Sequence, residues 1–233
     1  MILGIYGASG AGSELVGLVN RCEQYLEKEC AIFHKEYAPR WEKLVFIDDS
    51  PEKKGTEFFK LPVMSFEDAI NEYGLDGIEF ILAIGEPAVK DKVFEKVSAA
   101  GAKVTSIIYP EVILPNEYKH GPGLIIHKGS GMPPRANYGN NVLIQGVAII
   151  GHDVTLGDNV VVSSFAFVGG DTTIGRNTYV GPQSCIRNGL HIGENVIIGM
   201  GSVVTKDVPD NAVVYGNPAK VMRFNESGRV FSK

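Results

Sequence analysis

The chain has 233 residues, a net charge of −5 and no basic run, so a nucleic-acid surface, which needs clustered Lys and Arg, is not expected. Its hydrophobic content of 44% suits a globular protein, and no apolar segment is long enough to cross a bilayer. Residues 1–7 lack the basic and long apolar regions of a secretory signal, so we expect a cytoplasmic protein.

Residues 1–110 alternate short apolar runs with helical patterns. Four runs read as buried strands of a parallel sheet, at residues 2–7, 43–48, 78–85 and 104–109. Helices are expected over residues 12–29, from Ser65 onwards, and over Pro87–Ala100 with Val89, Val93, Phe94 and Val97 on one face. The pattern predicts an α/β, Rossmann-like βαβ domain over residues 1–110.

A glycine-rich turn follows the first strand and opens the first helix, with Gly7, Gly10 and Gly12 in it. Backbone N–H groups at such a helix start can bind phosphate, and Asp48 and Asp49 after the second strand could bind a ribose or base. A dehydrogenase is disfavoured, because about 110 residues are too few for two mononucleotide-binding halves.

From Ile126 onwards an apolar residue recurs every six positions, and a glycine often follows it directly. The series is Ile126, Met132, Tyr138, Ile144, Ile150, Leu156, Val162, Val168, Ile174, Val180, Ile186, Ile192, Ile198 and Val204. Each repeat is one short strand and one turn, and stacked repeats share a continuous core, so residues 111–233 are predicted to form an all-β, hexapeptide-repeat β-helix.

These repeats and the ending "GNPAK" at residues 216–220 resemble the left-handed β-helix acyltransferases, which use three repeats per coil. With "GASGAG", "FIDDSPEKKG" and "ILAIG" in the first domain, the chain resembles the sialic acid O-acetyltransferase and nucleotide-linked amino-sugar N-acetyltransferase family. The resemblance implies a homotrimeric enzyme that uses acetyl-CoA as co-substrate to acetylate a nucleotide-linked amino sugar in bacterial surface-glycan synthesis. O-acetylation of a sialic acid or related sugar is the alternative, and a non-catalytic nucleotide-sugar scaffold is a third possibility.

Residues one coil apart stack on each other, and with about 18 residues per coil this places Gly170 above His152. His152 is the third residue of its repeat, at a turn, which favours a functional role over that of a packed core histidine. Acetyl transfer from a thioester needs a base for the attacking group and a donor for the oxyanion, and the His152 ring and the Gly170 N–H could supply both. Asp153 either orients the imidazole or is a solvated turn residue.

The family resemblance implies roles for individual residues. His152, Asp153 and Gly170 would be catalytic. The acetyl-CoA contacts would be Gly170, Pro182, Gly199, Met200 and Gly201. The acceptor contacts would be Gly7, Ser9, Gly10, Asp48, Asp49, Gly85 and Gln145. Two positions depart from the family pattern, since many relatives carry histidine where this chain has Ala11 and Val161.

Metal chemistry is the main competing interpretation, because some hexapeptide β-helices bind zinc through three histidines. His127 is predicted on a different side from His152, His191 lies about two coils higher, and His34 and His120 precede the regular β-helix. Three widely spaced cysteines, Cys22, Cys30 and Cys185, form no metal-binding or disulfide pattern. We therefore expect no metal.

Overall fold

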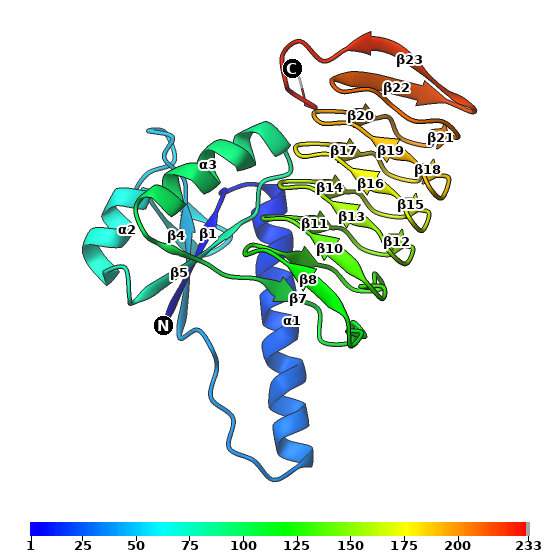
Figure 1. The fold of residues 1–233 in the computed structure, drawn as a ribbon. Helices are drawn as coiled ribbons and strands as arrows, with labels where there is room; N and C mark the ends of the chain where they lie inside the picture. The colour runs from blue at the N-terminus through cyan, green and yellow to red at the C-terminus, as the bar shows by residue number, and fades with distance from the viewer. Residues whose placement is uncertain (232–233) are drawn as a thin grey trace. The chain divides into compact units, whose positions relative to one another are not determined.

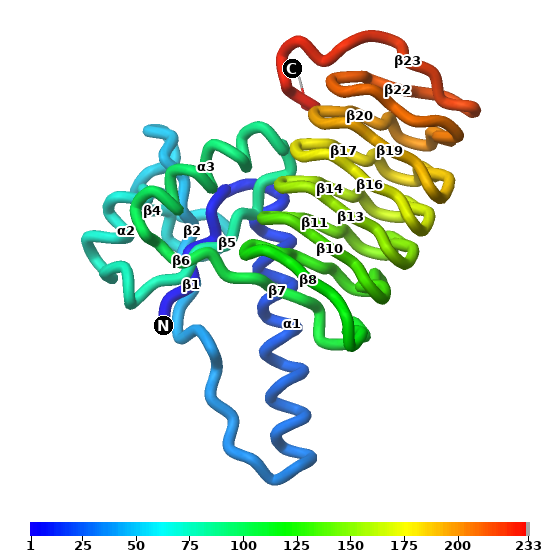
Figure 2. The backbone as a smooth tube through the Cα atoms, in the orientation of Figure 1, coloured from blue at the N-terminus to red at the C-terminus, as the bar shows by residue number. Residues whose placement is uncertain are grey.

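The computed structural model describes residues 1–231, and the chain divides into two compact units (Figures 1 and 2). The first comprises residues 1–85 and 93–106, and the second residues 86–92 and 107–233. The division therefore falls four residues before the predicted boundary, and a short piece of the third helix is grouped with the second unit. Among the described helices, none has the length and apolar character needed to span a membrane.

The first unit is built on a six-stranded sheet with the order β3-β4-β2-β1-β5-β6. Its strands are β1 (Ile2–Tyr6), β2 (Lys43–Ile47), β3 (Glu57–Phe58), β4 (Leu61–Met64), β5 (Ile78–Leu82) and β6 (Lys103–Val104). All neighbours pair in parallel except β3 and β4, an antiparallel pair that the sequence analysis missed. The predicted Rossmann-like βαβ fold is confirmed.

Three helices accompany this sheet: α1 (Gly10–Ile32), α2 (Phe66–Tyr73) and α3 (Pro87–Ala99). Ser65 caps α2 as predicted, because its hydroxyl accepts a hydrogen bond from the Asp68 amide at 3.1 Å. One expectation for α3 is wrong: Val89 is exposed, and the neighbouring Lys90 takes a buried position instead. Val97 is buried as expected.

The run at residues 104–109 is not one strand, as predicted, but two that belong to different sheets. Val104 pairs with Phe80 in the first unit, whereas β7 (Ile107–Ile108) pairs in parallel with β9 (Ile125–Ile126). Because both pieces are apolar and β-branched, their composition does not distinguish a Rossmann strand from a β-helix strand. The β-helix therefore begins at Ile107.

The second unit is a β-helix whose short strands form three sheets (Figure 1). The β11 sheet contains β7, β9, β11 (Leu143–Ile144), β14 (Val161–Val162), β17 (Tyr179–Val180), β20 (Ile197–Ile198), β22 (Ala212–Gly216) and β23 (Ala219–Phe224). The β12 sheet contains β12 (Ile149–Ile150), β15 (Phe167–Val168), β18 (Cys185–Ile186) and β21 (Val203–Val204). The β13 sheet contains β8 (Tyr118–His120), β10 (Ala136–Tyr138), β13 (Thr155–Leu156), β16 (Thr173–Ile174) and β19 (His191–Ile192). His120 thus lies on a β-helix strand, contrary to the expectation that it precedes the helix.

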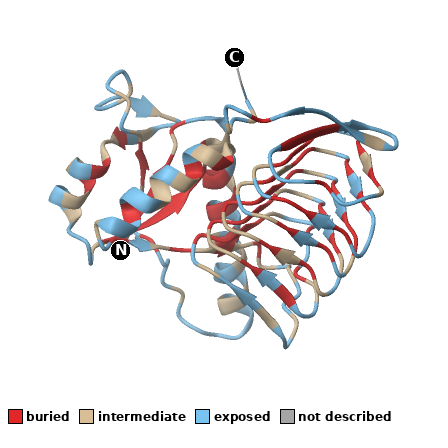
Figure 3. Cartoon of the chain, turned by 45° about the horizontal axis from the view of Figure 1, so that its top comes forward, coloured by how far each residue is buried: buried red, intermediate tan, exposed pale blue. Residues whose placement is uncertain are grey.

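Strands of successive coils pair in parallel, each with the strand three repeats later, as Ile149 with Phe167 and Phe167 with Cys185. Every position of the predicted six-residue series is buried and belongs to one hydrophobic core (Figure 3). The last coil is shorter, because Ile197 pairs with Val213 rather than with Tyr215, where the regular register would place its partner. The hexapeptide-repeat β-helix is confirmed.

Each turn of the β-helix places one residue in the left-handed region of backbone space. These residues recur every six positions: Gly123, Gly129, Arg135, Asn141, Val147, Asp153, Asn159, Phe165, Asp171, Asn177, Gln183, Gly189, Asn195 and Gly201. Glycine and asparagine tolerate this conformation best, which explains their frequency in the series. Because each regular coil contains three such turns, the members of the series stack at three corners of the coil, and side chains at one corner meet those one coil away.

Candidate functional site

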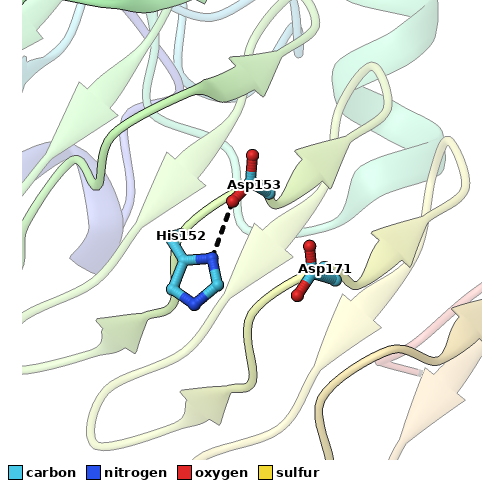
Figure 4. A group of neighbouring side chains, drawn as sticks. All are labelled: His152, Asp153 and Asp171. Carbon is cyan, nitrogen blue, oxygen red and sulfur yellow. Dashed lines mark hydrogen bonds and ion pairs between the residues drawn. The ribbon is translucent and has the colours of Figure 1, made fainter.

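His152 lies at the corner between the β12 and β13 sheets, which we call the His152 corner: residues 151–154 and their equivalents one or more coils away. Its side chain is 61% exposed, so it is not a packed core histidine. The ring Nδ1 is 2.7 Å from Asp153 Oδ2 (Figure 4). Since an ionised carboxylate only accepts hydrogen bonds, Nδ1 carries the proton and Nε2 is left as the acceptor.

Asp153 takes part in a second interaction, a bidentate ion pair with Arg135. Arg135 Nε is 2.5 Å from Asp153 Oδ1, and its Nη2 is 2.6 Å from Oδ2. The Arg135 guanidinium, followed by the hydrogen bond from His152, lowers the pKa of the Asp153 carboxyl to about 2. Asp153 is therefore ionised throughout the range in which imidazole titrates, and it is not merely a solvated turn residue.

Gly170 lies directly against the His152 ring, as the stacking rule predicts. A Cβ added to Gly170 would stand 3.1 Å from both Cε1 and Nε2 of His152. The next amide, that of Asp171, donates to the His152 carbonyl at 2.9 Å, whereas within residues 1–231 the Gly170 N–H has no hydrogen-bond partner. Gly170, with this N–H group, therefore lies beside Nε2, the atom expected to accept a proton.

A third polar side chain, Asp171, stands one coil from Asp153 at the same corner (Figure 4). One ligand atom from each of His152, Asp153 and Asp171 lies within 4.8 Å of the others, a spacing that could hold a metal ion. Both oxygens of Asp153 already accept hydrogen bonds from Arg135, whose positive charge disfavours a cation at this point.

Two further histidines of the β-helix lie away from His152, as expected. His127 follows β9 of the β11 sheet, and His191 lies on β19 of the β13 sheet.

Gly170 apart, the residues expected to contact acetyl-CoA stack at a different corner of the β-helix. Pro182 follows β17, and Gly199, Met200 and Gly201 follow β20, so all lie between the β11 and β12 sheets, together with Gln145 after β11. We call this the Gln145 corner. Met200 is 77% exposed, while Gly199 lies under the Tyr215 ring, which leaves no room for a Cβ there. Within one chain the β12 sheet separates these turns from His152, so the structure does not unite the two sets.

In the first unit, the expected acceptor residues share one edge of the sheet. Gly7, Asp48 and Gly85 follow the carboxyl ends of the adjacent parallel strands β1, β2 and β5, and ligands of open α/β sheets bind at this edge. Ser9 and Gly10 are exposed at the start of α1. Gly7 adopts φ 111° and leads directly into that helix.

The two aspartates at this edge are held by protein groups. Asp48 Oδ2 accepts from the Ala8 amide at 3.2 Å and from Lys53 Nζ at 2.9 Å. Asp49 accepts from Lys96 Nζ at 2.6 Å and from the Tyr6 hydroxyl. Burial acts to raise the pKa of both carboxyls, but hydrogen bonds, from Ser50 and Lys53 to Asp48 and from Lys96 and Tyr6 to Asp49, outweigh it and lower the pKa of each.

Sequence reasoning missed three cationic residues near these groups: Arg135, Lys53 and Lys96. The rule that found Gly170 would have found Arg135, which precedes Asp153 by one coil. No comparable spacing points to Lys53 or Lys96, because their contacts with Asp48 and Asp49 depend on the three-dimensional course of the loop and of α3.

Two protein families match parts of the chain. The PglD N-terminal domain matches residues 3–97, and the bacterial transferase hexapeptide (six repeats) matches residues 171–206. No curated protein sequence matches the chain significantly. The predicted resemblance is confirmed, because one part of the chain matches a PglD N-terminal domain and another part matches the repeats of bacterial hexapeptide transferases.

Several solved structures share this two-domain fold over nearly their whole length. The acetyltransferase domain of PglB from Neisseria gonorrhoeae FA1090, in complex with acetyl coenzyme A, is 24% identical with a TM-score of 0.80, covering 95% of this chain and 98% of that one. WeeI from Acinetobacter baumannii AYE is 27% identical with a TM-score of 0.78, at 95% and 100% coverage. PerB from Caulobacter crescentus, in complex with CoA and GDP-perosamine, is 20% identical with a TM-score of 0.77, at 96% and 98% coverage.

Proposed function

We propose that this chain, which joins a PglD-type domain to a hexapeptide-repeat transferase β-helix, is an acetyltransferase that moves acetyl from acetyl-CoA to the amine of a nucleotide-linked amino sugar. One observation carries the proposal: the oriented imidazole of His152 lies against Gly170, whose backbone N–H has no hydrogen-bond partner among residues 1–231. The domain order supports it, as do the PglB domain with acetyl coenzyme A and PerB with CoA and GDP-perosamine, which share the fold.

His152 would act as the general base. As the amine nitrogen attacks the thioester carbonyl carbon, Nε2 takes a proton from the nitrogen, and the N–C bond forms. Asp153 accepts the Nδ1 hydrogen bond and so stabilises the imidazolium that results. The imidazolium then returns the proton to the sulfur of CoA as the C–S bond breaks, which restores the base and releases the thiol.

Gly170 would stabilise the tetrahedral intermediate. Its N–H can donate to the oxyanion, and the missing side chain leaves room beside Nε2 for the reacting carbonyl. These two functions, combined at one small corner, explain why a histidine and a glycine stand one coil apart.

The acceptor would be held by the first unit. Gly7, Ser9 and Gly10 would bind the phosphate groups, and the edge formed by Asp48, Asp49 and Gly85 would hold the remainder of the nucleotide. Asp48 and Asp49 form ion pairs with Lys53 and Lys96, so the two carboxylates would also hold these ammonium groups at the site.

Replacing Asp48 and Asp49 by alanine should therefore raise the KM for the sugar nucleotide at least tenfold, and leave the KM for acetyl-CoA nearly unchanged. Steady-state kinetics with each substrate varied in turn measure this. Asp76→Ala, at an exposed turn before β5, is the matched control. An equal rise in both KM values would contradict the assignment of the first unit to the acceptor.

The chemical nature of the acceptor is tested by a panel. Purified protein is mixed with acetyl-CoA and either nucleotide-linked amino sugars, the same sugars lacking the amine, or free sialic acid, and thiol release is followed. Release only with amino sugars supports N-acetylation. Release with sialic acid or a hydroxyl acceptor replaces it with O-acetylation, and release with none, despite nucleotide-sugar binding, indicates a non-catalytic scaffold.

The separation of the two corners supports the expected homotrimer. If the acetyl donor contacts Pro182 and Met200, as the family resemblance implies, then the thioester reaches a His152 only when the Gln145 corner of one copy faces the His152 corner of another. We therefore expect light scattering to give three times the chain mass of 25.2 kDa. A fully active monomer at micromolar concentration would contradict this arrangement.

A further inference from the structure

We infer that Arg135 is a positioning residue for the base: its bidentate ion pair fixes the Asp153 carboxylate against His152 and offsets the negative charge around the imidazole. The inference rests on the proposed function for its kinetic part, and on the geometry of the free protein for the rest. Arg135 touches neither His152 nor any reacting atom, so it would act only through Asp153.

The backbone explains why Arg135 can reach Asp153. Both residues occupy the left-handed position of their turns, with φ 56° and 58°, and lie one coil apart. The coils are joined at this point by a hydrogen bond from the Asp153 amide to the Pro134 carbonyl, at 3.1 Å. Side chains leave equivalent positions in the same direction, so the guanidinium fork lies along the carboxylate.

The fork restricts the carboxylate in a way that a single hydrogen bond cannot. Two parallel contacts, from Nε and Nη2, fix the plane of the Asp153 carboxylate. The same carboxylate accepts the Nδ1 hydrogen bond of His152 at Oδ2. The orientation of the imidazole is therefore set by a residue one coil away, and its Nε2 is held toward Gly170.

Charge provides the second part of the inference. The charged and titratable groups around Asp153 are Arg135, His152 and Asp171, and Glu117 lies near the guanidinium. Within the described residues, Arg135 is the only guanidinium or ammonium that forms an ion pair with Asp153. Without the guanidinium, the negative charges of Asp153 and Asp171 beside the His152 ring would not be offset. They would stabilise the imidazolium, the form that cannot accept a proton.

Removing the guanidinium should therefore move the acid limb of the kcat/KM profile to higher pH. The expected shift for Arg135→Ala is about 0.5 to 1 pH unit at low ionic strength, and smaller at high salt. Turnover should fall by roughly tenfold, well short of the 10²–10⁴-fold loss expected when a general base is removed. Arg135→Lys keeps the charge but not the fork, so its pH limb should stay in place while turnover recovers only in part.

The test combines kinetics with a measurement that needs no substrate. The ring protons of His152 are titrated by NMR in the free protein, and assigned by their loss in His152→Ala. The matched control is Arg176→Ala, which removes another exposed arginine, paired with Asp91 at 2.7 Å, from the same β-helix. Circular dichroism verifies that each variant is folded.

An upward shift of the His152 titration in Arg135→Ala, absent in Arg135→Lys and Arg176→Ala, supports the inference. An unchanged titration midpoint and an unchanged pH limb overturn it, even if activity falls, because a purely structural role would lower activity without moving either. If no acetyl acceptor is found, the proposed function fails, yet the NMR titration still decides whether Arg135 controls the imidazole.

Discussion

Replacing His152 with alanine should lower kcat by roughly 10²–10⁴-fold, because the variant loses the proton acceptor but keeps the Gly170 N–H. The side chain is largely exposed, so its removal leaves no cavity in the core, and the fold should be retained. Acetyl-CoA affinity should barely change, as measured by calorimetry on the variant.

The intact enzyme should also lose activity toward acid pH, as the imidazole gains a proton and can no longer accept one. Asp153 cannot cause this decline, because its pKa of about 2 keeps it ionised well below the range of the assay. The matched control is His191→Ala, which removes an exposed imidazole from β19. Near-normal turnover of His152→Ala, measured near pH 7 with every candidate acceptor, would eliminate His152 as the base.

Placing a single methyl group at position 170 should lower kcat by about 10- to 100-fold. The Cβ of Gly170→Ala would stand 3.1 Å from Nε2 and Cε1 of His152, and equally close to the His152 carbonyl oxygen. Such contacts are tighter than side chains normally tolerate, so the ring must shift away from the position where the reacting carbonyl and the oxyanion donor meet. Steady-state kinetics and a thermal melt measure the effect.

The control for this variant is Gly131→Ala, because a Cβ at Gly131 meets nothing within 4 Å. Both glycines lie in the β-helix and neither has a positive φ. The two alanine substitutions should therefore change the conformational part of the free energy of unfolding by about the same amount. If Gly170→Ala loses activity only in proportion to its loss of folded protein, the proposed proximity of Gly170 to the reacting atoms is wrong.

Much of this fold can be predicted from the sequence because its periods are strict. Every position of the six-residue apolar series is buried in the β-helix core, and the three-repeat coil places Gly170 on His152 from spacing alone. Each inference needs only one quantity, the coil length, which the spacing and the family's three repeats per coil supply. The same coil length places Arg135 on Asp153, but no motif in the sequence marks Arg135 as a functional residue.

The remaining features depend on contacts that no period encodes. The apolar run at residues 104–109 is compatible with either unit, and its division is decided by pairing partners, Phe80 for Val104 and Ile125 for Ile107. Lys53 and Lys96 contact Asp48 and Asp49 through a loop and a helix whose courses the sequence does not reveal, so their ion pairs arise only from the tertiary fold. The separation of the two corners, in contrast, does follow from the coil length, because neither Pro182 nor Met200 is a whole number of 18-residue coils from His152.

The coil register also governs which changes in length the chain can accept. Arg135, Asp153 and Asp171 are aligned only because every coil between them has the same number of residues. Losing two residues between His152 and Gly170 would change the spacing that places Gly170 on His152. The coil that does lack two residues, between Ile197 and Val213, comes after these groups, next to the terminal strands β22 and β23. Insertions and deletions among relatives should therefore fall in whole coils up to this point, and single-residue length changes should be confined to the C-terminal end.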